Sequence, residues 1–114
     1  MRLKPIYDGR CVKIPRKLPN GIGDLEDVGG LSSAAVVSRL VELGAFVYEA
    51  DAGQVNVWLE RKKRGSETGY WVAYKRHAGQ LHKVYICEAF ALDPHNLDSA
   101  AVQLFDLLDL LDRE

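Results

Sequence analysis

The sequence predicts an α+β domain in which two helices pack on an antiparallel four-stranded meander. Residues 32–43 place apolar side chains at helical spacing, and residues 97–112 repeat leucines in the same way. Between these two segments, four stretches of alternating apolar and polar residues are separated by turn signals. Strands that follow one another without intervening helices favour an antiparallel sheet over a parallel one. With 114 residues, the chain is expected to form one domain over residues 1–114 with a core of its own.

Residues 1–30 contain three of the four prolines and lack a clear hydrophobic period. We predict an irregular segment here, with a short strand around Arg10 to Ile14 and a loop through residues 19–30. The glycines of this loop do not match a dinucleotide-binding or phosphate-binding pattern.

The first predicted helix begins after Ser32 or Ser33, both of which are good N-cap residues. It ends near Leu43, because Gly44 suits the left-handed position that follows a helix. Residues 45–50 and 54–60 then form two strands joined by a turn at residues 51–53, with Val55, Val57 and Leu59 on one face.

Residues 69–87 predict a β-hairpin rich in aromatic and basic side chains. A two-residue turn at Ala78 and Gly79 would pair Tyr74 with Lys83 and Val72 with Tyr85. One face would then carry Tyr70, Val72, Tyr74, Arg76, Leu81, Lys83, Tyr85 and Cys87. The other would carry Trp71, Ala73, Val84 and Ile86, with Lys75 and His82 near the tip. The second face is the more apolar, so we predict that it meets the core and that the tyrosines point outward.

The last predicted helix begins near Pro94 or Leu97, capped by Asp93 or Asn96, and ends at Asp112. Its apolar stripe covers the sheet, and its aspartates lie on the polar side. Leu107 and Leu110 widen this stripe beyond what one sheet face requires. We therefore predict that these two leucines contact a partner protein or a second copy of the chain.

The net charge is −1, but charges of one sign are grouped along the chain. Residues 1–19 carry six cations and one carboxylate, residues 61–83 carry seven cations and one carboxylate, and residues 93–114 carry six carboxylates and one cation. Such grouping either builds a basic and an acidic face or reflects ordinary solvated surface, and the sequence leaves both open.

No catalytic or metal-binding motif stands out, so we expect no enzyme, no cofactor and no metal site. His77 and His82 lack further ligands at metal-binding spacing. Cys11 and Cys87 lie far apart, which favours free thiols in a reducing compartment, and Cys87 is expected to be a buried strand cysteine. The sequence contains no apolar run of membrane-spanning length and no signal-peptide pattern. These features predict a cytoplasmic domain.

The segment GYWVAYKRHAGQLHKVYI, followed by a helix, resembles the β-β-α DNA-binding modules of bacterial integrases and tyrosine recombinases encoded by mobile elements. The matching residues lie in the last third to half of the chain: Tyr70, Trp71, Tyr74, Lys75, Arg76, Gly79, Lys83 and Tyr85. Such modules lay their sheet in the major groove of DNA, which implies that Tyr74, Lys75, Arg76, Lys83 and Tyr85 contact DNA here. The chain departs from that pattern at Cys87 and Glu88, where a glycine commonly follows the last strand.

Aromatic faces that stack on bases, beside cations that neutralise phosphates, are what a nucleic-acid-binding sheet requires. We therefore predict a non-catalytic domain that binds nucleic acid, in the form of duplex DNA. The predicted contacts are Lys62, Lys63, Arg64, Tyr70, Tyr74, Lys75, Arg76, Lys83 and Tyr85. Two alternatives remain: a protein-interaction or dimerisation module that uses the last helix, and a ligand cleft between the sheet and residues 1–30.

Overall fold

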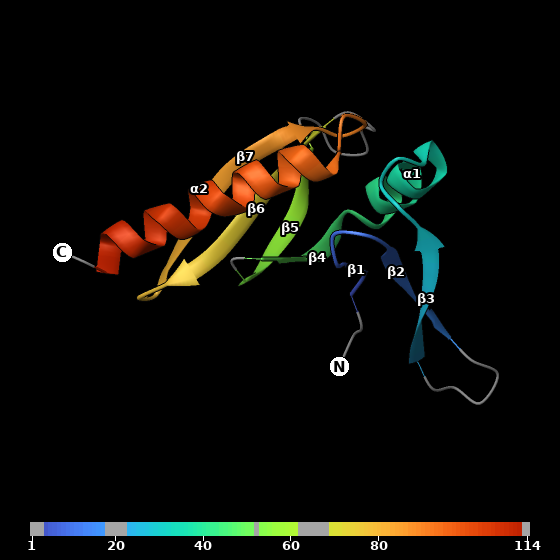
Figure 1. Ribbon diagram of the computed structural model, residues 1–114, viewed down its shortest axis with the longest axis horizontal. Coiled ribbons are helices and arrows are strands. Elements are labelled where there is room, and N and C mark those ends of the chain that lie inside the picture. Colours follow the sequence, from blue (N-terminus) through green and yellow to red (C-terminus); the bar gives the residue numbers. More distant parts are fainter. Residues whose placement is uncertain (1–3, 18–22, 52, 62–68, 113–114) are drawn as a thin grey trace.

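The computed structural model describes residues 4–17, 23–51, 53–61 and 69–112, and its fold is α+β. Its strands and helices run in the order β1 Ile6–Tyr7, β2 Val12–Lys17, β3 Gly23–Gly29, α1 Ala34–Leu43, β4 Ala45–Ala50, β5 Gly53–Arg61, β6 Gly69–His77, β7 Gln80–Glu88 and α2 Pro94–Asp112. The strands form one seven-stranded sheet in the order β3-β2-β1-β4-β5-β6-β7 (Figure 1). Neighbouring strands are antiparallel except β1 and β4, which are parallel. Neither described helix is long and apolar enough to cross a membrane.

The predicted four-stranded meander corresponds to β4–β7, and its strand order is confirmed. The prediction nevertheless understates the sheet, because β1, β2 and β3 extend it by three strands. The irregular loop expected over residues 19–30 is wrong for residues 23–29, which form β3. This strand is an edge strand whose side chains are almost all exposed, so it shows no apolar alternation to detect. Arg16 of β2 lies 3.8 Å from Asp24 and 3.7 Å from Glu26, which adds exposed ion pairs to the backbone ladder.

Both helices begin after a predicted capping residue, and α1 ends at the predicted Gly44. Ser33 is the N-cap of α1, and Gly44 ends it in the left-handed conformation, with φ of 76°. The Gly44 amide donates to the Leu40 carbonyl at 2.8 Å. At the start of α2, the Asp93 carboxylate accepts a hydrogen bond from the Asn96 amide at 2.7 Å. Because this bond satisfies an N-terminal amide that has no helical partner, it fixes the start of α2 at Pro94.

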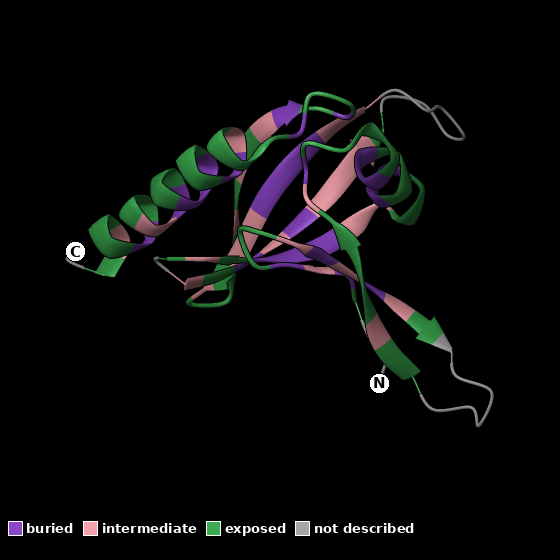
Figure 2. Ribbon diagram, turned by 45° about the vertical axis from the view of Figure 1, so that its right-hand side comes forward, coloured by how far each residue is buried: buried purple, intermediate pink, exposed green. Residues whose placement is uncertain are grey.

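Both helices pack on the same face of the sheet, which we call the inner face (Figures 1 and 2). A single buried cluster joins side chains of α1 and α2 to inward-pointing residues of β1, β2 and β4–β7. Trp71 is fully buried at its centre, contacts Phe46 edge-on and donates its indole N–H to the Ala89 carbonyl at 2.9 Å. The opposite face of β4–β7, which we call the outer face, carries no described helix.

The β6–β7 hairpin has the predicted register up to Val72 and Tyr85, and then departs from it. Ala78 and Gly79 form the turn, both with positive φ, and Tyr74 pairs with Lys83. Between Val72 and Trp71 the register shifts, so that Trp71 pairs with Cys87 rather than with Ile86. The extra residue is a β-bulge, which turns the following side chains to the other face.

The bulge corrects one face assignment of the sequence analysis. Cys87 does not share the outer face with Tyr70; it is buried in the inner cluster. Its place opposite Tyr70 is taken by Glu88, whose side chain is exposed.

Candidate nucleic-acid interface

The outer face carries four aromatic rings on three adjacent strands. The register places Trp58, Val72 and Tyr85 in one row across the sheet, and Asn56, Tyr74 and Lys83 in the next. A third row pairs Glu60 with Tyr70 and Tyr70 with Glu88. The strand period of two sends these side chains to the side opposite α2. The predicted outward orientation of Tyr70, Tyr74 and Tyr85 therefore agrees with the pairing.

These rings form two pairs. Trp58 and Tyr74 lie with ring centroids 4.0 Å apart and planes 30° apart. Tyr70 and Tyr85 lie 5.6 Å apart with planes inclined by 48°. Val72 is only 4% exposed although no helix covers it, which shows that its outer-face neighbours shield it. Tyr85, by contrast, is 57% exposed and offers most of its ring to solvent.

Glu60 holds the polar groups of this face in place. Its Oε1 accepts hydrogen bonds from the Lys83 ammonium at 2.7 Å and from the Trp58 indole at 3.1 Å. Its Oε2 accepts one from the Tyr70 hydroxyl at 2.9 Å. These donors, Lys83 first, lower the pKa of the Glu60 carboxyl, and the same carboxylate raises the pKa of Tyr70. Glu60 thus holds the Trp58 and Tyr70 side chains in place.

The predicted cations do not all gather on the outer face. Lys83 does, with its ammonium 5.5 Å from the centroid of the Trp58 ring, and Arg76 is exposed near the hairpin tip. Lys75 lies on the inner face, where its ammonium donates to the Gln54 carbonyl at 3.0 Å and stands 5.4 Å from the Phe105 ring. The remaining predicted contacts, Lys62, Lys63 and Arg64, lie outside the described residues.

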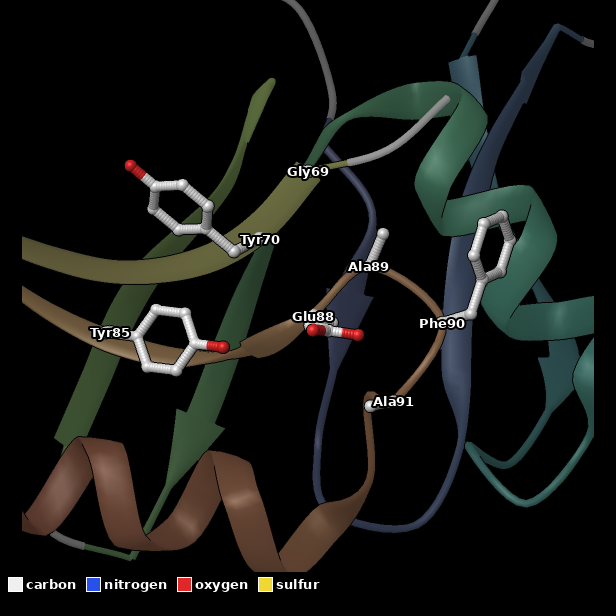
Figure 3. Close-up of a pocket in the computed structure, with 7 residues that line it drawn as sticks. All are labelled: Gly69, Tyr70, Tyr85, Glu88, Ala89, Phe90 and Ala91. Carbon is white, nitrogen blue, oxygen red and sulfur yellow. The ribbon is translucent and has the colours of Figure 1, made fainter. Parts of the chain in front are cut away.

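An open pocket of about 540 Å³ continues the outer face at the end where β6 begins and β7 ends (Figure 3). It is lined by Gly69, Tyr70, Tyr85, Glu88, Ala89, Phe90 and Ala91. The two tyrosine rings lie on one side and Phe90 on the other, beside α1, with Glu88 between them (Figure 3). Phe90 is 60% exposed, so the pocket adds a further accessible ring to those of the sheet.

The acidic helix α2 lies on the inner side, away from the outer-face rings. Its buried side chains are Leu97, Ala100, Ala101, Leu104 and Leu108. Leu107 and Leu110, predicted as partner contacts, are 36% and 60% exposed. At its end, Asp112 lies 2.8 Å from the His77 imidazole and ties α2 to the hairpin tip.

Within the described ranges, no three histidine, cysteine or acidic side chains gather as metal ligands. Burial raises the pKa of the Cys87 thiol to about 11, which keeps it protonated at neutral pH. The Tyr48 hydroxyl donates to Asp98, and its ring stacks on Tyr7 with centroids 5.3 Å apart. This contact fastens α2 to β4.

The chain matches no protein-family model, no curated protein and no solved structure.

Sequence reasoning missed four residues of the outer face and its pocket: Trp58, Glu60, Glu88 and Phe90. For Trp58 and Glu60 the signal was present, because Val55, Val57 and Leu59 on the inner face leave the alternate residues outside. For Glu88 no signal existed, since only the bulge brings it beside Tyr70.

Proposed function

We propose that this protein binds nucleic acid through the outer face of β4–β7. The observation that carries the proposal is an uncovered sheet face with four aromatic rings beside Lys83, while the acidic helix lies on the other side. Rings of this kind stack on bases whatever their sequence, because every base has a π-face.

The arrangement favours unpaired bases over the duplex DNA that the sequence predicts. In a duplex, each base is already stacked between its neighbours, and a side chain reaches only the base edges in the grooves. The outer face presents flat rings, and the most accessible, Tyr85, is suited to stacking. An unpaired base that stacks on an aromatic side chain gains about 1–3 kcal/mol.

The described residues place only a few cations on the outer face, so phosphate contacts should contribute modestly to the binding free energy. Lys83 already pairs with Glu60. It can contact a phosphate either while this ion pair persists or by replacing Glu60 with the phosphate as its partner. Arg76 lies exposed two residues farther toward the hairpin tip than Tyr74. Binding should therefore weaken with salt, but with a slope that reflects about two phosphate contacts from these residues.

Fluorescence anisotropy of a labelled dT12 single strand and of a labelled 12-base-pair duplex tests the proposal. We expect the single strand to bind more tightly, and Tyr85→Leu to weaken its binding by roughly 5- to 150-fold, since one stacking contact is lost. Val102→Ala is the matched control, because Val102 is 54% exposed on α2 but belongs to the other side of the sheet. Equal affinities of wild type and Tyr85→Leu for dT12 would refute the proposed interface.

The second candidate function is self-association through α2. The exposure of Leu107 and Leu110 on its last turns supports it, because large exposed apolar side chains near one another commonly mark contacts. Sedimentation velocity tests this candidate: Leu110→Asp should convert a dimer to a monomer. A wild-type protein that sediments as a monomer at high concentration would exclude it.

A further inference from the structure

The pocket at the end of the outer face combines aromatic rings with a carboxylate, so it can distinguish between ligands by their hydrogen-bonding groups. Its described lining contains one charged group, the Glu88 carboxylate, among aromatic and small residues. Glu88 is exposed, and none of the ion pairs between described residues includes it. A carboxylate accepts hydrogen bonds and donates none at neutral pH. The pocket therefore suits a flat group that carries hydrogen-bond donors on one edge.

The position of Glu88 is fixed by the backbone around it. The Ala89 amide donates to the Gly69 carbonyl at 3.0 Å, and the Ala91 amide donates to the Glu88 carbonyl at 3.0 Å. The Ala89 carbonyl in turn accepts the indole N–H of the buried Trp71. These bonds anchor to the core the turn that carries Glu88, so the backbone that presents its carboxylate is held in place.

The spacing of Tyr70 and Tyr85 determines where a nucleobase can stack in the pocket. A ring sandwiched between two others needs about 7 Å between their planes, twice the contact distance of carbon atoms. Tyr70 and Tyr85 are 5.6 Å apart and inclined by 48°, so nothing flat fits between them. A base must instead stack on the open side of Tyr85, which is 57% exposed. The volume of about 540 Å³ lies within the range of small-molecule sites, roughly 300–1,000 Å³.

We propose that this pocket takes one unpaired guanine of a bound single strand, stacked on Tyr85 and read by Glu88. This inference rests on the proposed function of the outer face. Guanine carries two parallel donors on its pairing edge, the ring N1–H and the exocyclic amino group, which match the two oxygens of a carboxylate.

The other bases fit less well for a chemical reason. Adenine and cytosine each present an amino group beside a ring nitrogen that accepts, so they offer one favourable contact. Thymine and uracil present one ring N–H between two carbonyls, which face the carboxylate unfavourably. A good bidentate contact discriminates between bases by roughly 5- to 150-fold. The pocket should therefore rank guanine first and thymine last.

The test compares labelled dT12 with the same strand carrying one dG at position 6, and with single dA or dC substitutions. We expect wild-type protein to bind the dG strand roughly tenfold more tightly than dT12, and the dA and dC strands between the two. Glu88→Gln should reduce the guanine preference to less than about threefold, because the amide offers one acceptor and places a donor beside the other guanine N–H. Asp106→Asn is the matched control, since it removes an exposed carboxylate of α2, on the other side of the sheet, and should retain the preference.

The outcomes separate the two proposals. If every strand binds equally and Tyr85→Leu still weakens binding, the outer face functions as proposed and the guanine pocket is wrong. If the preference survives in Glu88→Gln, the role given to Glu88 is wrong. If no strand binds, both proposals fail. Tetramethylammonium that shifts the Tyr85 resonances at concentrations where guanosine monophosphate does not would assign the pocket to cations instead.

Discussion

Gly69→Ala should destabilise the protein although the backbone of Gly69 is not in the left-handed region. A Cβ atom on Gly69 would stand 2.5 Å from the Glu60 carbonyl oxygen and 3.3 Å from the Arg61 Cα. The obstacle is the backbone of the neighbouring strand, so no side-chain rotation relieves it. Ordinary contact begins at about 3.4 Å. The start of β6 must therefore move about 0.9 Å away from β5, where residues 61 and 69 pair.

The size of the effect follows from two opposing contributions. Overpacking of a well-packed site costs about 1–3 kcal/mol. Replacing glycine by alanine restricts the unfolded chain and returns about 0.4–1 kcal/mol. The midpoints of these two ranges, about 2 and about 0.7 kcal/mol, leave a net loss of about 1.3 kcal/mol, which for a domain of this size lowers Tm by roughly 5 °C.

Urea unfolding followed by tryptophan fluorescence measures this loss. Gly44→Ala is the matched control, because nothing lies within 4 Å of its Cβ position and its φ of +76° is the only cost. Gly44→Ala should lower the free energy of unfolding by about 1 kcal/mol and leave the outer face unchanged. Gly69→Ala should also weaken the guanine preference, since Gly69 lines the pocket. A Gly69→Ala protein as stable as wild type would refute the close approach of β5 and β6.

Three further predictions concern single side chains. Ala78→Asn should stabilise the protein by about 0.5–1 kcal/mol in thermal unfolding, because Ala78 has φ of 52° in a turn that asparagine tolerates better; a lower Tm would contradict this turn. Iodoacetamide at pH 8 should modify Cys11 before Cys87 in the native protein, since Cys87 is buried and its pKa is raised to about 11; equal rates by mass spectrometry would contradict the buried site. The pKa of Glu60 is lowered, so its contribution to stability is present above its unfolded value of about 4.3 and disappears as pH falls through the folded pKa. Lys83→Met should raise this pKa in an NMR titration, and an unchanged value would show that the ion pair does not form in solution.

The sequence predicts correctly those parts of the fold that depend on residues close together in the chain, such as helix caps and tight turns. Gly44 and Asp93 mark helix ends because their conformation or side chain satisfies terminal backbone groups. Ala78 and Gly79 form a two-residue turn, and this alone sets the register as far as Tyr85. The outward tyrosines follow from that register.

The parts that sequence did not predict depend on contacts between distant segments. The strand β3 has no apolar face and is held by its ladder to β2 at the edge of the sheet. The bulge near Trp71 places Glu88 rather than Cys87 on the outer face. No residue type or pattern in the local sequence indicates this bulge. Lys75 belongs to the same hairpin as the outer-face residues, but its side chain points toward α2, where its ammonium lies over the Phe105 ring.

A backbone and side-chain NMR titration with dT12 locates the binding surface residue by residue. If the outer face binds the strand, resonances should shift at the Trp58 indole and at the amides around Tyr70, Tyr74 and Tyr85, and none should shift along α2. The fully buried Trp71 indole serves as an internal control that should stay unchanged. Shifts confined to Leu107, Leu110 and their neighbours, or no shifts at all, would show that the outer face does not bind the strand.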